Sequence, residues 1–264
     1  MPVISLTTDF GIRNGFVGVM KGVIYKIAPD VKIVDISHTI AAQDIREGAF
    51  ALWRACSFFP NKTVHIFVVD PGVGTKRRPM AARLGSQFFV GPDNGLLTPI
   101  IEDSERENLL MEFVELDNPK FWLPKVSRTF HGRDIFAPVA AHLANGFSLR
   151  DVGTPFDEPV RIEMPRPQKI SNGFIAHVTG MDTFGNIATD LPASALAGQT
   201  DILLRFRGAE IHGLTESYGH RAPGDLVAVV DSEEFIEIAV VNGSAAQRLG
   251  AQAGDEVEVF FSVK

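Results

Sequence analysis

The sequence feature that most restricts the fold is a change of pattern about two thirds of the way along the chain. Before it, short runs of β-branched and aromatic residues alternate with segments of helical periodicity, which is typical of βαβ units around a mainly parallel sheet. After it, only short β-rich segments follow, separated by Gly, Asp and Asn, which is typical of a small barrel or sandwich. We therefore predict an N-terminal α/β domain and a smaller C-terminal all-β barrel domain.

The spacing of apolar residues places the elements of the first part. Residues 15–27 carry apolar side chains at intervals of three and four, and Pro29 ends this amphipathic pattern. Asp44 is a suitable N-cap for a second helix. The predicted helices span 15–27, 44–58 and 134–145, and the predicted strands span 3–7, 32–36, 63–69, 80–84 and 87–90.

A proline-rich segment separates the two predicted domains. Pro155, Pro159, Pro165 and Pro167 stand close together among few apolar neighbours, a composition typical of an inter-domain linker. We place the boundary near Gln168, so that the predicted domains span 1–167 and 168–264. The strands expected in the second domain cover 174–179, 202–207, 226–230, 235–241 and 257–263.

Composition excludes several classes of protein. The 264 residues hold 25 Lys and Arg against 32 Asp and Glu, a formal net charge of −7, which disfavours a nucleic-acid partner. No stretch approaches the roughly 18 apolar residues of a membrane helix. The N-terminal apolar run meets a charge at Asp9, too early for a signal peptide. We therefore expect a cytoplasmic protein with no membrane partner, in which the single cysteine, Cys56, packs in the core.

Three of the predicted strands end in acidic residues, at Asp9, Asp35 and Asp70. Ligands of open α/β sheets bind beyond the carboxyl ends of the strands, so we expect the chemistry here. Asp70 precedes the glycine-rich segment 71–75, and Arg77 is near enough to fold back and pair with it. The alternative for this segment is a tight turn with a capping Asp. It lacks the third glycine of a dinucleotide fingerprint and the Gly-Lys-Ser/Thr of a P-loop.

Three further loops combine glycine with polar side chains. Residues 91–95 read Gly-Pro-Asp-Asn-Gly, for which an ordinary turn is the main alternative. His131, just before a predicted helix, is compatible with a ligand, a base or a satisfied structural residue. Residues 180–186 hold a carboxylate, an aromatic ring and an amide, which suit an ammonium group, a flat ring and a base edge, and equally suit a turn.

Together these loops resemble the S-adenosylmethionine (SAM) hydroxide adenosyltransferases, relatives of the SAM-dependent fluorinase and chlorinase. The resemblance runs the whole length of the chain. It rests on seven ordered segments: Thr8-Asp9-Phe10-Gly11, Asp35-Ile36-Ser37-His38, Val69-Asp70-Pro71-Gly72-Val73-Gly74-Thr75, Pro92-Asp93-Asn94-Gly95, Phe130-His131-Gly132-Arg133-Asp134, Phe184-Gly185-Asn186 and Ile236-Glu237-Ile238-Ala239. It implies an α/β domain, a β-barrel domain, and a homotrimer whose active sites lie between one subunit's N-domain and its neighbour's C-domain.

The resemblance also separates hydrolysis from halogenation. This chain has Asp70 where the halogenases carry Tyr, and Gly132 where the fluorinase has a halide-contacting Ser. Gln43 stands in place of a Trp that lines the halogenase pocket. The hydrolytic branch uses an Asp, an Arg and a His together, which Asp70, Arg77 and His131 match. These three are therefore the predicted catalytic residues, and halide use is not expected.

The same resemblance implies the substrate contacts, which are made to the ribose, the methionine end and the adenine. They come from Asp9 (ribose hydroxyls), Asp182 (ammonium), Ser232 (carboxylate), Phe184 (packing on the ligand), Asn186 (adenine), and Asn242 and Gly243 (adenine, through the backbone). The arginine that the fluorinase places beside its Ser is absent from 232–234, and the arginine preceding its Asn is Val241 here.

The implied reaction is attack of water on C5′ of SAM, in line with the sulfonium, to give adenosine and methionine. Methionine leaves as a neutral thioether, so only the water needs activation and positioning. Asp70 would orient or deprotonate it, Arg77 would fix Asp70 and favour hydroxide, and His131 would accept or relay the proton. Which residue is the base stays open. The activated substrate needs no cofactor and no metal.

Two other functions are compatible with the residues. Asp9, Asp35, Asp70 and His131 could bind a divalent metal in a phosphoester hydrolase, because carboxylate and imidazole groups often share such ions. A non-catalytic SAM- or adenosine-binding protein would keep the pocket and turn nothing over.

Overall fold

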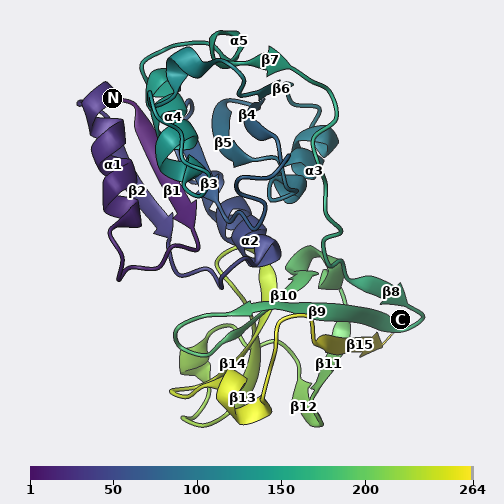
Figure 1. Cartoon of the computed structure of the whole chain (residues 1–264). Helices are drawn as coiled ribbons and strands as arrows, with labels where there is room; N and C mark the ends of the chain where they lie inside the picture. The colour runs from purple at the N-terminus through teal and green to yellow at the C-terminus, as the bar shows by residue number, and fades with distance from the viewer. Residues whose placement is uncertain (263–264) are drawn as a thin grey trace. The chain divides into compact units, whose positions relative to one another are not determined.

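The computed structural model describes residues 1–262, and the chain folds into two compact units (Figure 1). Unit 1 is Met1–Met164 and unit 2 is Pro165–Lys264. The boundary predicted near Gln168 falls at the start of the first strand of unit 2, β8 (Gln168–Ile170).

Unit 1 is built on a mixed, mostly parallel sheet with the strand order β2-β1-β3-β5-β4-β6-β7. The pairs β2-β1, β1-β3 and β3-β5 are parallel. Strand β4 pairs antiparallel with both β5 and β6. The predicted α/β class is therefore confirmed. The strands are β1 (Val3–Thr8), β2 (Lys32–Ser37), β3 (Val64–Val68), β4 (Pro79–Leu84), β5 (Gln87–Pro92), β6 (Met111–Glu115) and β7 (Thr154–Pro155).

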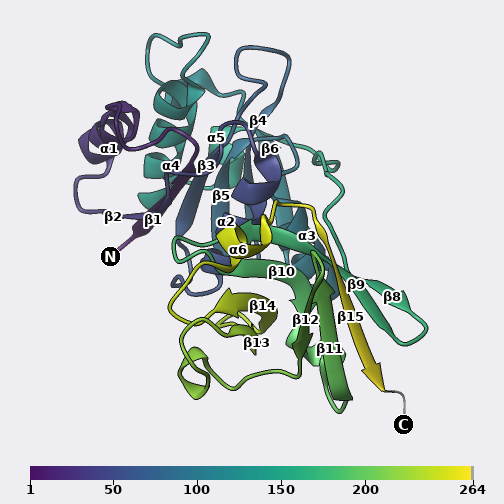
Figure 2. The same ribbon diagram turned by 90° about the horizontal axis from the view of Figure 1, so that it is seen from below.

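Helices cover both faces of this sheet (Figure 2). Met20 and Ile24 of α1 pack with α4 on one face, while Leu52 of α2 and Ile101 of α3 pack on the other. Strand β3 is buried at every position because it is covered on both sides, which explains its unbroken apolar pattern. The helices are α1 (Phe16–Ile27), α2 (Ile45–Cys56), α3 (Thr98–Arg106), α4 (Ala137–Ala144) and α5 (Leu149–Val152), with a 3₁₀ turn η1 at Pro119–Phe121.

Local chemistry explains where several elements begin. The carboxylate of Asp44 accepts a hydrogen bond from Glu47 N at 2.9 Å, so the predicted N-cap of α2 is confirmed. Cys56 is buried at the end of this helix, as predicted. The helix predicted over 134–145 differs at its start, where Gly132–Phe136 (η2) is a π-helical turn that leads into α4. One extra residue in a turn leaves the apolar spacing almost unchanged, so the sequence pattern does not reveal it.

One of the three acids expected at strand ends is placed differently. Strand β2 continues to Ser37, so the prediction that Asp35 ends it is wrong. Asp35 lies within this edge strand, where its carboxylate binds Lys21 Nζ at 2.6 Å and His38 Nε2 at 3.0 Å. Asp9 and Asp70 do follow the ends of β1 and β3, and the pairing of Thr8 with Val68 brings those two ends together.

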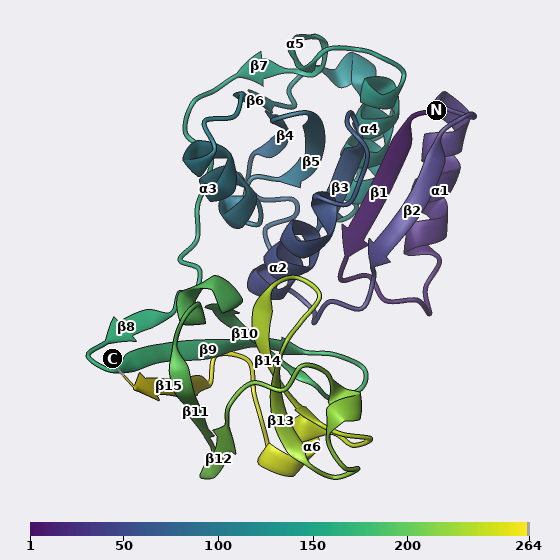
Figure 3. The ribbon, with the colours of Figure 1, turned by 180° about the vertical axis from the view of Figure 1, so that it is seen from behind.

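Unit 2 is an antiparallel, nearly closed barrel, which confirms the predicted second fold (Figure 3). The strand order is β12-β11-β15-β9-β10-β14-β13, with β8 beside β9. The chain just after β12 closes toward the other end of this order, since Thr215 N donates to Ala228 O of β13 at 2.8 Å. The remaining elements are β9 (Gly173–Met181), β10 (Ile187–Pro192), β11 (Thr200–Phe206), β12 (Ala209–His212), β13 (Leu226–Val230), β14 (Phe235–Val240), β15 (Glu256–Ser262), α6 (Ala245–Leu249), and the 3₁₀ turns η3 (Ala193–Leu196) and η4 (Tyr218–His220).

The sequence pattern misses several elements, including α3, β6, β10 and β12. In β10, Asp190 interrupts the apolar pattern, yet its carboxylate is satisfied by the backbone N of His177 at 2.7 Å and by the ring Nδ1 at 2.8 Å. The last predicted strand extends to residue 263, which lies outside the described residues. Within 1–262, no helix has the length and apolar character needed to cross a membrane.

Candidate active site

The first site feature is a buried ion pair that follows β3. Arg77 Nε donates to Asp70 Oδ1 at 3.1 Å, and Arg77 Nη2 donates to Asp70 Oδ2. The side chains are 7% and 5% exposed. A two-pronged contact of this kind fixes the plane of the carboxylate as well as its charge. The pairing that the sequence spacing suggested is therefore present.

Successive turns fold the chain back between these two residues. Val73 N donates to Asp70 O at 3.3 Å, and Thr75 Oγ1 donates to Gly72 O at 2.7 Å. Arg77 N in turn donates to Thr75 Oγ1 at 3.2 Å, which fixes the backbone from which the guanidinium extends.

Gly74 brings this loop against a second one. It adopts a φ of +75°, and a Cβ here would lie 2.3 Å from the backbone oxygen of Arg128. Only glycine permits both this conformation and this close approach. The contact holds the 70–77 loop beside the segment that ends at His131.

His131 completes the cluster, because its Nδ1 lies 3.3 Å from Arg77 Nη2. Burial and the positive charge of Arg77 hold the pKa of His131 below its usual range, although Asp70 and Asp134 act in the opposite direction. The imidazole is therefore neutral near pH 7. The structure thus brings the three predicted catalytic residues together.

One nitrogen of the guanidinium has no partner within the cluster. Arg77 Nη1 is buried and finds no acceptor among residues 1–262. A buried donor of this kind needs an acceptor, and one from outside the chain, such as water or a substrate atom, would satisfy it. The ring of Phe136 covers the guanidinium carbon at 5.4 Å.

Gly132, beside His131, lies in a crowded place. A Cβ there would lie 3.2 Å from Met20 Sδ, 3.4 Å from Phe130 Cε2 and 3.5 Å from Phe10 Cε2. The two ring distances are ordinary van der Waals contacts, whereas the approach to Met20 is tight, so a side chain at this position would require a small shift of the Met20 thioether.

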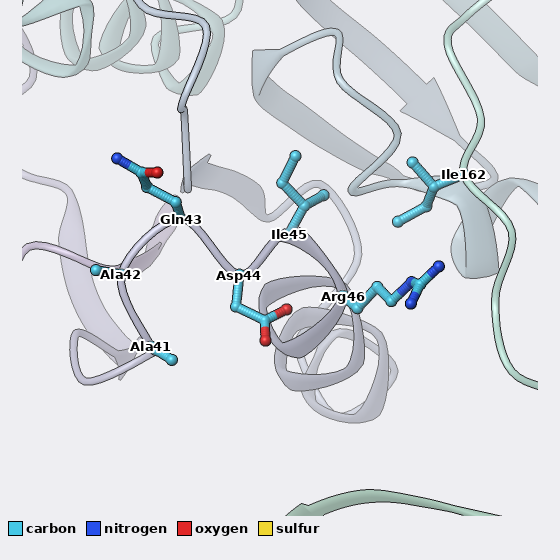
Figure 4. A pocket seen from close by; sticks show the side chains of 7 residues that line it. All are labelled: Ala41, Ala42, Gln43, Asp44, Ile45, Arg46 and Ile162. Atoms are coloured by element: carbon cyan, nitrogen blue, oxygen red, sulfur yellow. The ribbon is translucent and has the colours of Figure 1, made fainter. Parts of the chain in front are cut away.

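Asp9, predicted to bind ribose hydroxyls, lies beyond the end of β1. Its Oδ2 accepts a hydrogen bond from Gln43 N at 2.9 Å, and Gln43 adopts a left-handed φ of 67°. A pocket of about 520 Å³ opens beside this contact (Figure 4). Arg46 and Ile162 lie toward one end of the pocket and Gln43 toward the other.

The Pro92–Gly95 segment contacts the chain just before Asp70. The carboxylate of Asp93 is buried and accepts from Val160 N at 2.8 Å, with Arg78 Nε at 3.3 Å. Asn94 Nδ2 donates to Val69 O at 2.8 Å, next to Asp70. These hydrogen bonds lie within the protein, which is the arrangement that the turn interpretation predicts for this loop.

In unit 2, three of the predicted substrate residues form one turn. Asp182 Oδ1 accepts from Phe184 N at 2.9 Å and from Asn186 N at 2.8 Å, while Asp182 Oδ2 accepts from Asn186 Nδ2 at 3.0 Å. Phe184 is 77% exposed at the tip of the turn. Gly185 has a φ of +81°, and a Cβ there would lie 2.0 Å from Ser244 Oγ, so glycine is required.

The remaining predicted residues also lie on turns of the barrel. Ser232 is in the turn before β14, which Asp231 Oδ1 organises by accepting from Glu233 N at 2.8 Å and Phe235 N at 2.9 Å. Asn242, with a φ of 54°, and Gly243 lie between β14 and α6. Unit 2 therefore carries all the predicted adenine and methionine contacts, and unit 1 carries the Asp70, Arg77 and His131 cluster.

A further polar pair in unit 2 was not predicted. Tyr218 Oη donates to Glu237 Oε1 at 2.5 Å, and Glu237 is buried within β14. Burial, Glu237 and the charges of Asp182 and Asp231 raise the pKa of Tyr218. The sequence signal was a carboxylate inside an otherwise apolar strand, in the Ile236–Ala239 segment.

The metal-site alternative finds no matching geometry. Within residues 1–262, no three His, Cys, Asp or Glu side chains are grouped so as to hold a metal ion. Asp35, one of its four proposed ligands, is engaged by Lys21 and His38 instead.

Comparisons with known proteins agree along the whole chain. A model of the SAM hydroxide adenosyltransferase N-terminal domain matches residues 4–153, and a model of the corresponding C-terminal domain matches residues 176–258. An (R)-S-adenosyl-L-methionine hydrolase of Salinispora arenicola is 39% identical, covering 98% of this chain and 97% of its own length. Another, of Thermus thermophilus, is 36% identical, covering 98% and 100%.

A solved structure agrees with the fold. The crystal structure of a conserved protein from Thermotoga maritima superposes with a TM-score of 0.90 at 36% identity, covering 98% of this chain and 100% of that one. With both domain models matched in order, and with near full-length relatives above 30% identity, the chain belongs to the SAM hydroxide adenosyltransferase family.

Proposed function

We propose that this protein hydrolyses SAM to adenosine and methionine by in-line attack of water at C5′. The observation that carries the proposal is the buried cluster of Asp70, Arg77 and His131, in a chain whose near full-length relatives are named SAM hydrolases. A fixed carboxylate, an unsatisfied guanidinium nitrogen and a neutral imidazole are the groups that a nucleophilic water needs.

In the proposed step, the C5′–O bond forms as the C5′–S bond breaks. The sulfur keeps the bonding electron pair and leaves as a neutral thioether, so no acid is needed at the leaving group. The proton of water passes to Asp70 or His131 and then to solvent. Arg77 stabilises the developing hydroxide through Nη1, which has no other acceptor in residues 1–262.

The substrate contacts form the second part of the proposal. Asp9 would bind the ribose hydroxyls with the carboxylate that Gln43 N already orients. In unit 2, Asp182 would bind the ammonium, Ser232 the carboxylate, Phe184 would pack on the ligand, and Asn186, Asn242 and Gly243 would contact adenine. The charges of SAM favour this assignment, because its sulfonium and ammonium groups complement Asp9, Asp70 and Asp182.

The configuration at sulfur is the third part. Both hydrolase relatives carry the R configuration in their names, so we extend the proposal to the R epimer of the sulfonium. Separate incubation of the enzyme with each sulfonium epimer tests this. Faster turnover of the R epimer is expected, and equal rates would remove the preference.

The decisive experiment is turnover in ¹⁸O-labelled water, followed by mass spectrometry. Attack at C5′ puts the label in the 5′ hydroxyl of adenosine and leaves methionine unlabelled. Unlabelled adenosine, or no turnover by the wild-type protein, would overturn the proposal. A non-catalytic SAM-binding protein would bind the substrate in the same samples without forming products.

We propose further that the reaction requires no cofactor and no metal, since the sulfonium already activates C5′. Turnover should survive prolonged treatment with a chelator. Loss of activity on chelation, restored by a divalent cation, would instead favour a metal-dependent hydrolase.

Finally, we propose a cytoplasmic homotrimer whose active sites combine unit 1 of one subunit with unit 2 of another. The distribution of the predicted residues over two units supports this. Asp70→Ala and Asp182→Ala subunits, each inactive, should form mixed trimers with about a quarter of the wild-type activity after random co-assembly. No recovery would indicate that each site is made by a single subunit. Light scattering gives the oligomeric state, and cell fractionation tests the location.

A further inference from the structure

The residues after His131 include a carboxylate that the proposed reaction leaves without a role. The Asp134 side chain is completely buried. Its Oδ1 accepts from Arg133 Nε at 2.6 Å, and its Oδ2 accepts from Arg133 Nη2 at 3.1 Å and from Ser127 N at 2.8 Å. Burial alone would raise the pKa of Asp134, but the hydrogen bonds from Arg133 and Ser127 lower it, so the group stays ionised.

The partners of Asp134 lead directly to the residues around His131. Ser127, whose backbone N donates to Asp134, also acts on the His131 imidazole, where its backbone raises the pKa. Ser127 Oγ also accepts from Phe130 N at 3.0 Å. Arg133 also contacts Phe130, since its guanidinium carbon lies 5.2 Å from the centroid of the Phe130 ring. Both routes therefore end at the segment 127–131.

The backbone of this segment departs from a regular helix at the same point. His131 is the N-cap of the π-helical turn Gly132–Phe136, and Asp134 lies at the centre of that turn. The oxygen of Phe130 accepts from both Arg133 N at 3.2 Å and Asp134 N at 3.1 Å. Wide turns of this kind are uncommon and persist where surrounding contacts hold them. Asp134 supplies such contacts from within the turn.

We propose that Asp134 is a positioning residue for the hydrolysis, which holds segment 127–131 so that the His131 imidazole stays against Arg77. This inference rests on the proposed function. Asp134 touches neither Asp70 nor Arg77 through any hydrogen bond within residues 1–262. It acts on His131 in two ways, through the backbone that carries the imidazole and through its negative charge, which opposes the lowering of the His131 pKa.

The test begins with Asp134→Asn in the full-length protein. An NH₂ group in the place of Oδ1 loses the bond from Arg133 Nε, and one in the place of Oδ2 loses the bonds from Arg133 Nη2 and Ser127 N, so at least one contact is lost in either orientation. We expect kcat to fall roughly 10- to 100-fold, as for other small displacements of a catalytic group, while the KM for SAM stays within about threefold. Unchanged kcat in the folded variant would overturn the proposal.

Asp190→Asn is the matched control. Asp190 is also a buried carboxylate that accepts two hydrogen bonds, both from His177, and it belongs to unit 2. Both variants lose a buried charge, so both should lower the thermal midpoint. Only Asp134→Asn should lower kcat, and an equal loss of kcat in both would indicate a general effect of stability.

A double-mutant cycle shows whether Asp134 acts through His131. In a His131→Ala background, Asp134→Asn should have little further effect on kcat, because the group that it positions is already absent. The same fold-loss in both backgrounds would contradict the proposal. If Asp134→Asn fails to fold, Ser127→Ala takes its place, since it removes a hydroxyl that accepts from Phe130 N and acts on Asp134, and it should lower kcat without raising KM.

A spectroscopic readout separates this proposal from the proposed function. The ring signals of His131, identified by their absence in His131→Gln, should move in Asp134→Asn and stay in place in Asp190→Asn. This measurement needs no turnover. If the wild-type protein does not hydrolyse SAM but the His131 signals shift in Asp134→Asn, the proposed function is wrong and the structural link between Asp134 and His131 is still supported. If the wild-type protein hydrolyses SAM but the His131 signals do not shift in Asp134→Asn, only the proposed link between Asp134 and His131 is wrong.

Discussion

The guanidinium Nη2 of Arg77 lies 3.3 Å from Nδ1 of His131, and the same nitrogen donates a hydrogen bond to Oδ2 of Asp70. One positive charge therefore acts on both groups that could take a proton from water. It holds the carboxylate through two hydrogen bonds and opposes the protonation of the imidazole.

Arg77→Lys should lower kcat roughly 100-fold or more and change SAM affinity by no more than about threefold. Lysine keeps the charge but cannot reach both oxygens of Asp70 and also leave a nitrogen for the water. Asp70→Ala and His131→Ala should likewise reduce turnover more than binding. Steady-state kinetics and calorimetric titration with SAM measure the two effects.

Arg78→Lys is the matched control for this prediction. Arg78 is the next residue, but it pairs with Asp93 and stacks on Phe156, with 4.0 Å between its guanidinium carbon and the ring centroid. Its kcat should stay near the wild-type value. Loss of SAM binding in Arg77→Lys, with kcat intact, would show that Arg77 holds substrate rather than water.

The pKa of His131 provides the second prediction. Burial and Arg77 lower this pKa. An ordinary histidine is half protonated at about pH 6.5, whereas the imidazole of His131 is still mostly neutral at that pH. If the reaction needs the neutral form, the acid limb of kcat/KM lies below that value. Arg77→Gln removes the nearest positive charge and leaves Asp70 and Asp134, so the pKa of His131 should rise.

Proton NMR titration measures this pKa directly, with Arg78→Gln as the control because the Arg78 guanidinium pairs with Asp93 and stacks on Phe156. A pKa that falls in Arg77→Gln, or that moves equally in both variants, contradicts the electrostatic account.

The site could be predicted from sequence only where its contacts are local. Asp70 and Arg77 are seven residues apart, and a glycine-rich turn is enough to join them. Arg77 and His131 are 54 residues apart, and their contact depends on the close approach of Gly74 to Arg128. No spacing rule encodes that approach, so only the family resemblance grouped all three.

The fold, too, could be predicted only where its pattern is local in the sequence. Apolar periodicity identified α1, α2 and most strands, because those patterns arise within each element. It placed Asp35 at a strand end because the length of an edge strand is set by its partner, here β1. The contacts of Asp190 were missed for a related reason, because their donor, His177, lies on a different strand. Those of Asp134 come from the nearby Arg133 and Ser127, but they form around a π-helical turn that the apolar pattern does not reveal.

The turn at Asp182 yields a third prediction, which separates two roles of one carboxylate. Asp182 Oδ1 accepts two backbone N–H groups and Oδ2 accepts the Asn186 amide, so the carboxylate shapes the turn before any ligand binds. Asp182→Asn can keep the backbone bonds and removes the charge. If Asp182 binds the ammonium, the KM for SAM should rise roughly 10- to 100-fold, the usual loss for a hydrogen bond to a charged group.

Adenosine binding is the control for that experiment, because adenosine has no ammonium group. Asp182→Asn should bind adenosine nearly as the wild type does, whereas Asp182→Ala should lose both ligands as the turn relaxes. Equal weakening of SAM and adenosine by Asp182→Asn would show that the carboxylate only organises the loop.

A fourth prediction concerns stability and rests on a histidine outside the catalytic cluster. His65 is fully buried in β3, where its Nδ1 lies 2.6 Å from Ser5 Oγ and its ring stacks on Phe89 at 5.0 Å between centroids. Burial lowers the pKa of His65 to about 4. The unfolded chain has the ordinary value of about 6.5 and binds the proton first. Stability is therefore complete above pH 6.5 and is lost as the pH falls toward 4.

The linked change in unfolding free energy is roughly 3 kcal/mol over this range. Urea unfolding monitored by tryptophan fluorescence measures this free-energy change for unit 1 alone, since both tryptophans, Trp53 and Trp122, lie in that unit. His65→Asn should be less stable at pH 7, because the stacked ring is lost, but its stability should fall less steeply between pH 6.5 and 4. His212→Asn, which replaces an exposed imidazole in unit 2, should keep the wild-type slope. An unchanged slope in His65→Asn would mean that other groups, such as His131 and His142, account for the acid sensitivity.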